Sequence, residues 1–295
     1  MALEILQTAS IAGLTFSCWE ILITLQDEVE IIWPRRTTIV KGLYFFTRYF
    51  ALVIQICNIF IAKILRVRYP VKREICRLWL SYQALSVFFM LGALDLILMA
   101  RVYAFYNRKR WIAILIMFLL FVRVGLSSAS AVATLPDQTF DNSCLNDYIP
   151  TMVMYFFIVG EFLLQGTILA LTMAKHIMAV RAGWARTPLV SLLCRDGATT
   201  FTIIVGVLIG TIIYARCEFT HDSAHAVFPT FVAVLSCLGC RLIVNMMKLV
   251  VDSTSTAVAG TQNRSPEILE FTTIIESIWS QTASDARVSS TVSIL

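Results

Sequence analysis

The chain has 295 residues, 58% of them hydrophobic and 15% charged, with a net charge of +5. Its mean hydropathy of +0.77 does not suit a water-soluble fold. Two soluble domains with large cores would show apolar stripes at helical spacing rather than continuous runs of about 18 residues or more. The runs in this chain are continuous, so we predict an integral membrane protein.

Seven apolar runs follow one another, and each is long enough to cross about 30 Å of hydrocarbon as a helix. Helices are favoured because a backbone in lipid must satisfy its own hydrogen bonds, and barrel strands would alternate apolar and polar residues. The predicted fold is all-α, a seven-transmembrane-helix bundle in residues 1–250. The predicted spans are Ile5–Leu25, Ile39–Ala62, Leu78–Ala100, Trp111–Ala133, Thr151–Ala174, Gly197–Ala215 and Val227–Val250.

Residues 251–295 change to a Ser/Thr-rich composition, which predicts a flexible cytosolic tail that can be phosphorylated. Within the tail, apolar residues recur at helical spacing among glutamates, so a short amphipathic helix is expected there. These apolar residues are Ile268, Phe271, Ile275 and Ile278.

The balance of Lys and Arg between loops predicts the orientation. The loops after the first, third and fifth spans carry ten cations, against seven in the loops after the second and sixth spans and between the fourth and fifth. We therefore expect the N-terminus outside and the C-terminus in the cytosol. The cations at the end of the third span, Arg101, Arg108, Lys109 and Arg110, would then anchor it at an anionic inner surface.

Apart from Lys41 and Lys248 near span ends, three acids and three arginines lie within the predicted spans. A charge near the bilayer centre costs at least about 2.5 kcal/mol, so these residues should face the bundle interior and pair. By depth, Arg123 is expected to pair with Glu161, Asp95 with either Arg241 or Arg48, and Glu20 with the other. The network is either a switch or ion path, or a structural clasp that fixes helix order.

Three cysteines, Cys76, Cys144 and Cys217, fall near the proposed outer face, where oxidising conditions permit a disulfide. Cys76 with Cys144 is the candidate pair, partly by analogy with seven-helix receptors, and three unpaired thiols are the alternative. The cysteines inside spans are interpreted as packing residues.

Few residues of the chain suit catalysis or metal binding. His221 and His225 are spaced like metal ligands, but His176 lies at the opposite membrane face, so a solvated loop is the favoured interpretation. We expect no metal, no cofactor and no enzymatic activity. The positive charge is explained by loops at the inner surface, and nucleic acid is not an expected partner.

Several strings resemble a large family of uncharacterised seven-helix membrane proteins from basidiomycete fungi. They are "WEILITLQDEVEIIWPRR" from Trp19, "YFFTRYF" from Tyr44, "LMARVYAFYNRKR" from Leu98, "LLCRDGATTF" from Leu192 and "CRLIVNMM" from Cys240. The chain has Trp19 and Glu20 where the family usually has Tyr-Asp, and Thr47 before Arg48 where it has Asn. The resemblance implies the seven-helix topology and carries no known activity.

Two functions are expected to compete. The first is receptor-like signalling at the plasma membrane. Its candidate site is the inner end of the third helix, at Arg101, Tyr103 and Tyr106, and a cytosolic partner would bind the basic loops and the tail. The second is a small-molecule or ion transporter that uses the charges Arg123 and Glu161 near the midplane. Neither broken helices nor internal repeats, which are common in transporters, are clear in this chain.

Overall fold

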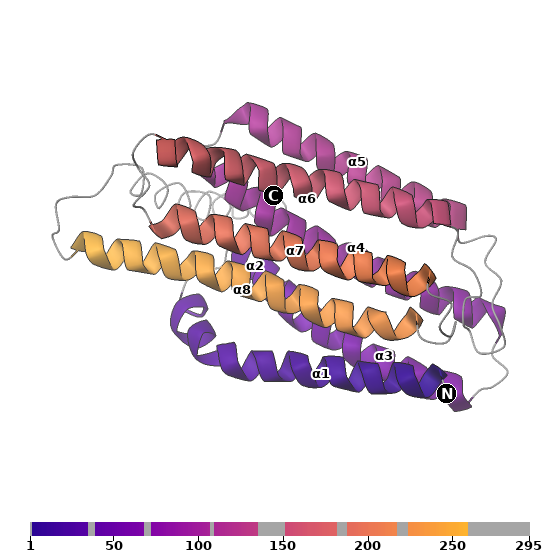
Figure 1. Cartoon of the computed structure of the whole chain (residues 1–295). Coiled ribbons are helices and arrows are strands. Elements are labelled where there is room, and N and C mark those ends of the chain that lie inside the picture. Colours follow the sequence, from indigo (N-terminus) through magenta and orange to yellow (C-terminus); the bar gives the residue numbers. More distant parts are fainter. Residues whose placement is uncertain are drawn as a thin grey trace, which may run out of the picture.

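In a computed structural model of the chain, the helices lie side by side in an elongated bundle (Figure 1). Each element in the described part of the chain is helical, which confirms the predicted all-α fold. The structure describes residues 2–34, 39–67, 72–106, 109–134, 151–181, 188–216 and 224–258. The predicted amphipathic helix of the tail and the predicted pair His221 and His225 involve residues or side chains outside this description.

The first two membrane helices each contain a π-helical turn. Helix α1 (Ala2–Asp27) continues directly into the π-helix η1 (Glu28–Ile32). The second membrane helix consists of α2 (Ile39–Phe45), the π-helix η2 (Phe46–Phe50) and α3 (Ala51–Val67) without interruption. The first helix is therefore longer than the predicted span, which ended at Leu25.

Five further helices complete the bundle, which makes seven helices within the described part of the chain. Their bounds are α4 (Arg73–Phe105), α5 (Arg110–Thr134), α6 (Thr151–Arg181), α7 (Pro188–Arg216) and α8 (Ala224–Val258). Helix α8 runs past the predicted boundary at Val250. The helix packs against α1, α4 and α7, and α5 packs mainly against α6.

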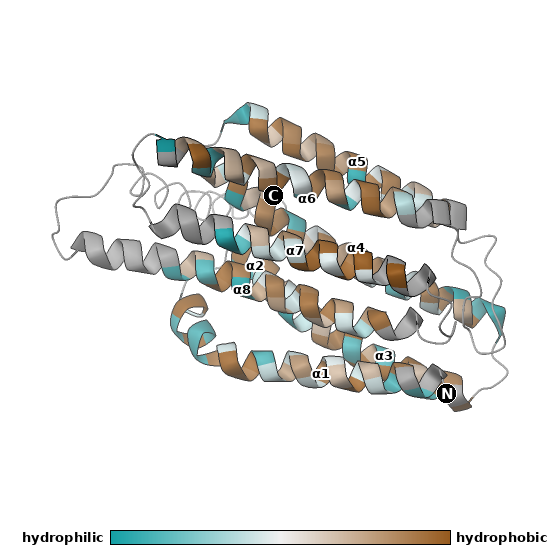
Figure 2. Ribbon diagram, viewed as in Figure 1, coloured by the Kyte–Doolittle hydropathy of each residue, from teal (hydrophilic) through white to brown (hydrophobic). Residues whose placement is uncertain are grey.

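The bundle has an apolar core, and it also exposes many large apolar side chains and buries several charged ones. Large apolar side chains such as Leu22 and Phe121 are 67% and 68% exposed, whereas Asp95 and Glu28 are fully buried. Figure 2 shows hydrophobic residues along the middle of the helices. Such an outer surface fits lipid, because contiguous apolar patches of this extent are rare on soluble monomers. Among the described residues, six helices are long and apolar enough to span a membrane.

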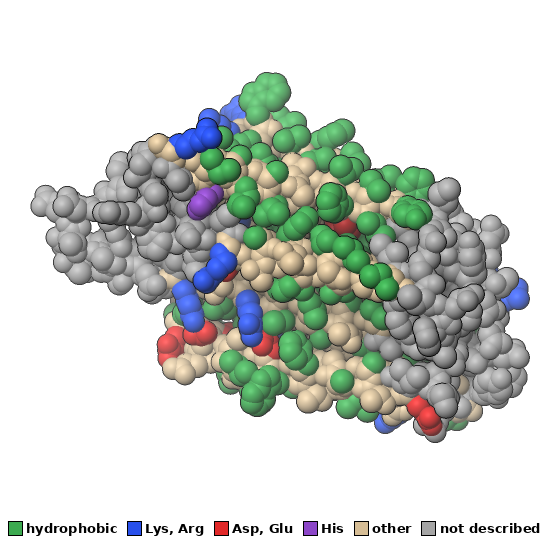
Figure 3. All heavy atoms as spheres, viewed as in Figure 1, with side chains coloured by type: hydrophobic (Ala, Val, Ile, Leu, Met, Phe, Trp, Pro, Cys, Tyr) green, Lys and Arg blue, Asp and Glu red, His purple; other side chains and the backbone are tan. Residues whose placement is uncertain are grey.

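The helices run up and down, so their ends meet at two faces of the bundle (Figure 1). We call the face where α4, α6 and α8 finish the Arg101 end, and the opposite face the Lys63 end. Described cations near the Arg101 end are Lys41, Lys109, Arg110, Lys175, Arg181, Arg195 and Lys248, and those near the Lys63 end are Lys63, Lys72, Arg73 and Arg77. Figure 3 shows Lys and Arg side chains towards the Arg101 end.

Candidate functional site

One buried ionic network joins the two π-helical turns of the N-terminal hairpin. Arg48 Nη2 lies 3.0 Å from Oε2 of Glu28, and the two side chains are 2% and 1% exposed. Tyr44 donates its hydroxyl proton to Glu28 Oε2 over 3.3 Å, and Trp33 Nε1 donates to Oε1 at the same distance. The carboxylate of Glu28 is therefore held by a cation and two neutral donors.

The guanidinium of Arg48 also binds groups of α1. Its Nη1 donates to Thr24 Oγ1 at 2.9 Å, and its Nη2 donates to the carbonyl oxygen of Ile21 at 2.9 Å. In α8, Ser236 donates to the carbonyl oxygen of Thr47 at 3.0 Å. This acceptor belongs to η2, and π-helical turns are frequent at functional sites.

Two further ion pairs connect α1 with α8. Arg241 donates from Nε to Glu20 Oε1 at 2.7 Å and from Nη2 to Oε2 at 3.1 Å. Lys248 Nζ lies 2.9 Å from Asp27 Oδ2. Asp27 lies seven positions after Glu20, and Lys248 lies seven positions after Arg241. The two ion pairs therefore repeat at the spacing of a heptad.

A second buried network lies between α4, α5 and α6. The guanidinium of Arg123 contacts Glu161 through both Nε and Nη2, and its Nη1 lies 3.2 Å from Asp95 Oδ2. Gln165 Nε2 donates to the other oxygen of Asp95. These four side chains are at most 3% exposed. The Phe88 ring lies 5.7 Å from the guanidinium carbon of Arg123. In the core of the bundle, one cation therefore contacts two carboxylates.

At the Arg101 end, polar contacts connect α4 with α6 and α8, and α7 with α8. Arg101 Nη2 donates to the carbonyl oxygen of Leu242 in α8. Asn245 Nδ2 of α8 donates to Asp196 Oδ2 of α7 at 2.9 Å. Tyr106 donates its hydroxyl proton to the carbonyl oxygen of Leu171 at 2.9 Å.

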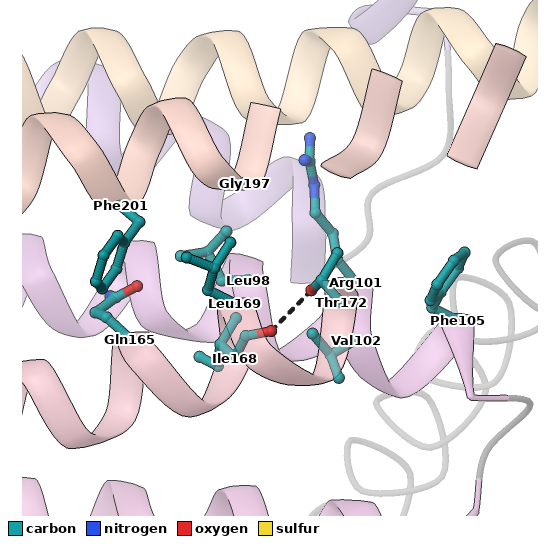
Figure 4. Close-up of a pocket in the computed structure, with 10 residues that line it drawn as sticks. All are labelled: Leu98, Arg101, Val102, Phe105, Gln165, Ile168, Leu169, Thr172, Gly197 and Phe201. Atoms are coloured by element: carbon teal, nitrogen blue, oxygen red, sulfur yellow. Dashed lines mark hydrogen bonds between the residues drawn. The ribbon is translucent and has the colours of Figure 1, made fainter. Parts of the chain in front are cut away.

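The side chain of Arg101 borders a small cavity of about 20 Å³ among α4, α6 and α7. Figure 4 shows Phe105 at one end of the lining residues, and the Arg101 side chain extending from α4 towards α7 and α8. The volume suits one water molecule. Arg101 is 5% exposed, and its Nε and Nη1 have no hydrogen-bond partner among the described residues.

The predicted contact between Arg123 and Glu161 is present, and Glu20 binds Arg241, which was one of its two predicted partners. The predicted pairing of Asp95 with Arg241 or Arg48 is wrong, because Asp95 binds Arg123. The predicted depths of these residues in the membrane were compatible with either arginine as the partner of Asp95. The rotation of each helix about its axis decides instead which side chains face each other.

Sequence reasoning missed Glu28 and Gln165 as members of these networks. Glu28 was placed in a loop, yet Glu20, Thr24 and Glu28 follow one another at intervals of four residues, which is the spacing of one helix face. Gln165 likewise lies one helical turn after Glu161. These polar stripes were signals that could have found both residues.

Among the other predicted site residues, Tyr103 is half-buried on α4. Cys76 is disulfide-bonded, and its predicted partner Cys144 lies outside the described residues, so this pairing stays a prediction. Cys18, Cys57, Cys237 and Cys240 are free thiols. Within the described part of the chain, no three side chains of His, Cys, Asp or Glu come together as metal ligands would.

These features define the class of the chain, which is an integral, multi-pass membrane protein. Residues 9–53 match the model of a family of unknown function, DUF6533. The matched segment contains α1 from residue 9 onward, both π-helical turns and the Glu28–Arg48 pair, so the N-terminal network lies within the similar region. No curated protein and no solved structure matches the chain.

Proposed function

We propose that this protein is a receptor-like signalling protein of the plasma membrane, with the Arg101 end in the cytosol. The observation that carries the proposal is the buried guanidinium of Arg101, which borders a cavity and has two nitrogen atoms that no described residue contacts by a hydrogen bond. Neither an enzymatic activity nor a cofactor forms part of the proposal. We further propose that the resemblance at residues 9–53 extends over the whole bundle, as in the fungal family of seven-helix proteins.

An unsatisfied buried donor costs about 1–3 kcal/mol, so an additional acceptor for Arg101 Nε or Nη1 would be stabilising. Asp196 of α7 is the acid next to this region, but its carboxylate accepts from Asn245 of α8. A movement of α7 that brings Asp196 to Arg101 would satisfy the guanidinium and separate α7 from α8. Two such arrangements of similar free energy form a switch that a ligand can bias.

The distribution of charge supports the proposed orientation. The described cations are more numerous at the Arg101 end than at the Lys63 end, and an excess of Lys and Arg favours the cytosolic side. The same basic surface, together with the Ser/Thr-rich tail, would meet a cytosolic signalling partner.

Two substitutions should change basal signalling in opposite directions. Asn245→Ala releases Asp196 and should raise nucleotide exchange on heterotrimeric G proteins several-fold in reconstituted liposomes. Asp196→Asn removes the acid that Arg101 would bind, so it should lower exchange below the wild-type level. Lys63→Gln is the control, because Lys63 is exposed at the opposite end of the bundle, away from the proposed partner surface. If no G protein responds to the wild type or to either variant, the receptor-like proposal is wrong.

Transport is the second candidate, and it is favoured by the two carboxylates that share Arg123. Such a site could carry an ion through the bundle. In proteoliposomes, Glu161→Gln and Arg123→Gln should then abolish a flux of protons or alkali cations. An unchanged flux in both variants would dismiss transport.

A further inference from the structure

We propose that Asp95, Arg123, Glu161 and Gln165 form a proton-binding site, in which the two carboxylates together hold one proton at neutral pH. We call these residues the core cluster. Proton binding by the core cluster does not depend on coupling to a G protein.

The core cluster carries a net charge when both of its acids are ionised. With both acids ionised, two carboxylates face one guanidinium, which leaves a net charge of −1 in a region that is at most 3% exposed. A single uncompensated charge at the centre of a bilayer costs at least about 2.5 kcal/mol. One bound proton makes the core cluster neutral.

Within the described part of the chain, the other buried arginines have partners elsewhere and do not balance the charge of the core cluster. The nearest arginine on α4 is Arg101, which lies six residues further along and binds the carbonyl oxygen of Leu242. Arg48 and Arg241 are bound to Glu28 and Glu20. On α7, the neighbour of α6 at this level is Phe201, which packs its ring 5.9 Å from that of Phe162. Among the described residues, Arg123 is therefore the cation that faces these acids.

The hydrogen bonds of the core cluster leave carboxylate oxygens at which a proton could bind. Asp95 Oδ1 accepts from Gln165, and Glu161 Oε1 accepts from Arg123. Asp95 Oδ2 and Glu161 Oε2 have no hydrogen-bond partner in the described part of the chain. Asp95 Oδ2 lies 3.2 Å from Arg123 Nη1, whereas the contacts of Glu161 with Arg123 are made by Oε1. A proton can therefore bind Glu161 Oε2 without displacing a hydrogen bond or an ion contact. Because the acids interact through Arg123, the proton belongs to the pair rather than to either residue.

The other buried acids provide a built-in comparison. Glu28 has Arg48 and Glu20 has Arg241, so each of these acids has its own arginine and needs no proton for neutrality. The inference is therefore specific to the core cluster and does not apply to every acid within the membrane helices.

Infrared difference spectroscopy between neutral and alkaline buffer tests the inference on the full chain in lipid nanodiscs. The wild type should show the C=O stretching band of about one protonated carboxyl group, which disappears at alkaline pH. Asp95→Asn and Glu161→Gln should each abolish the band, because the remaining acid then has Arg123 to itself. Glu20→Gln should leave the band unchanged.

Two results would overturn the inference: a wild-type spectrum without a protonated carboxyl band, or a band that survives in both single variants. The wild-type spectrum decides the first point even if a variant fails to fold. Because the assay contains no G protein, its outcome is independent of the signalling experiment.

Discussion

Glu28 and Arg48 join the two π-helical turns of the N-terminal hairpin, with 3.0 Å between Oε2 and Nη2. The residues are twenty positions apart, and each lies within one of the π-helical turns. This pair gives the hairpin a buried polar centre in the segment that matches the family of unknown function.

Breaking this pair should destabilise the protein strongly. Glu28→Gln and Arg48→Gln each leave a buried charge without its partner, which costs about 3–5 kcal/mol of the free energy of unfolding. The double variant should cost clearly less than the sum of the two, as measured by thermal unfolding in detergent. Glu30→Gln is the control, since Glu30 lies in the same π-helical turn but is exposed, and strictly additive effects would contradict the pairing.

Gly13 allows α1 to approach the hydrogen bond between Gln55 and Pro229. A Cβ atom at Gly13 would lie 2.9 Å from Gln55 Nε2 and 3.2 Å from the Pro229 carbonyl oxygen. Gly13→Ala should therefore cost about 1–3 kcal/mol through overpacking, measured as a lower melting temperature. Gly210→Ala should be close to neutral, because a Cβ atom there meets nothing within 4 Å of the described residues. Equal effects would show that the close approach is unimportant.

Asn58 connects three helices near the Lys63 end. Its Nδ2 donates to Ser10 Oγ at 2.9 Å, and its Oδ1 accepts from Trp79 Nε1 at 3.4 Å. Hydrogen bonds between membrane helices contribute about 0.6 kcal/mol on average and up to about 1.7 kcal/mol. We expect Asn58→Ala to reduce the free energy of unfolding by about 1–2 kcal/mol, and Ser10→Ala by less. A neutral Asn58→Ala variant would argue against this connection.

Tags at both termini can test the predicted orientation. In intact cells, protease should remove an N-terminal tag and leave a C-terminal tag protected, because the excess of described cations lies at the Arg101 end. The opposite pattern would place Cys76 on the reducing side and overturn the receptor-like layout.

The partner of Cys76 can be identified by mass spectrometry of the alkylated, non-reduced protein. We expect a cross-linked peptide that contains Cys76 and Cys144, and Cys144→Ser should make the Cys76 thiol available to alkylation after denaturation. A cross-link from Cys76 to any other cysteine would contradict the predicted pair.

The amino-acid sequence was sufficient to predict the helical, multi-pass class and the order of the helices. Long apolar runs have one stable form in lipid, because each backbone hydrogen bond must be made within the segment. The same physics predicted that the acids and arginines inside the spans would be paired. Glu161 with Arg123 could be predicted in this way, because both residues lie near the middle of their spans.

The tertiary structure decided which side chains share a network. Asp95 faces Arg123 rather than Arg48, and Arg48 faces Glu28, because helix rotation and the π-helical turns set the direction of each side chain. The apolar pattern could not predict where the first helix ends. Glu28 is polar in sequence, and it becomes buried only because Arg48 and Tyr44 lie beside it. Composition and spacing determine that the bundle exists, whereas packing of the helices determines where its charges meet.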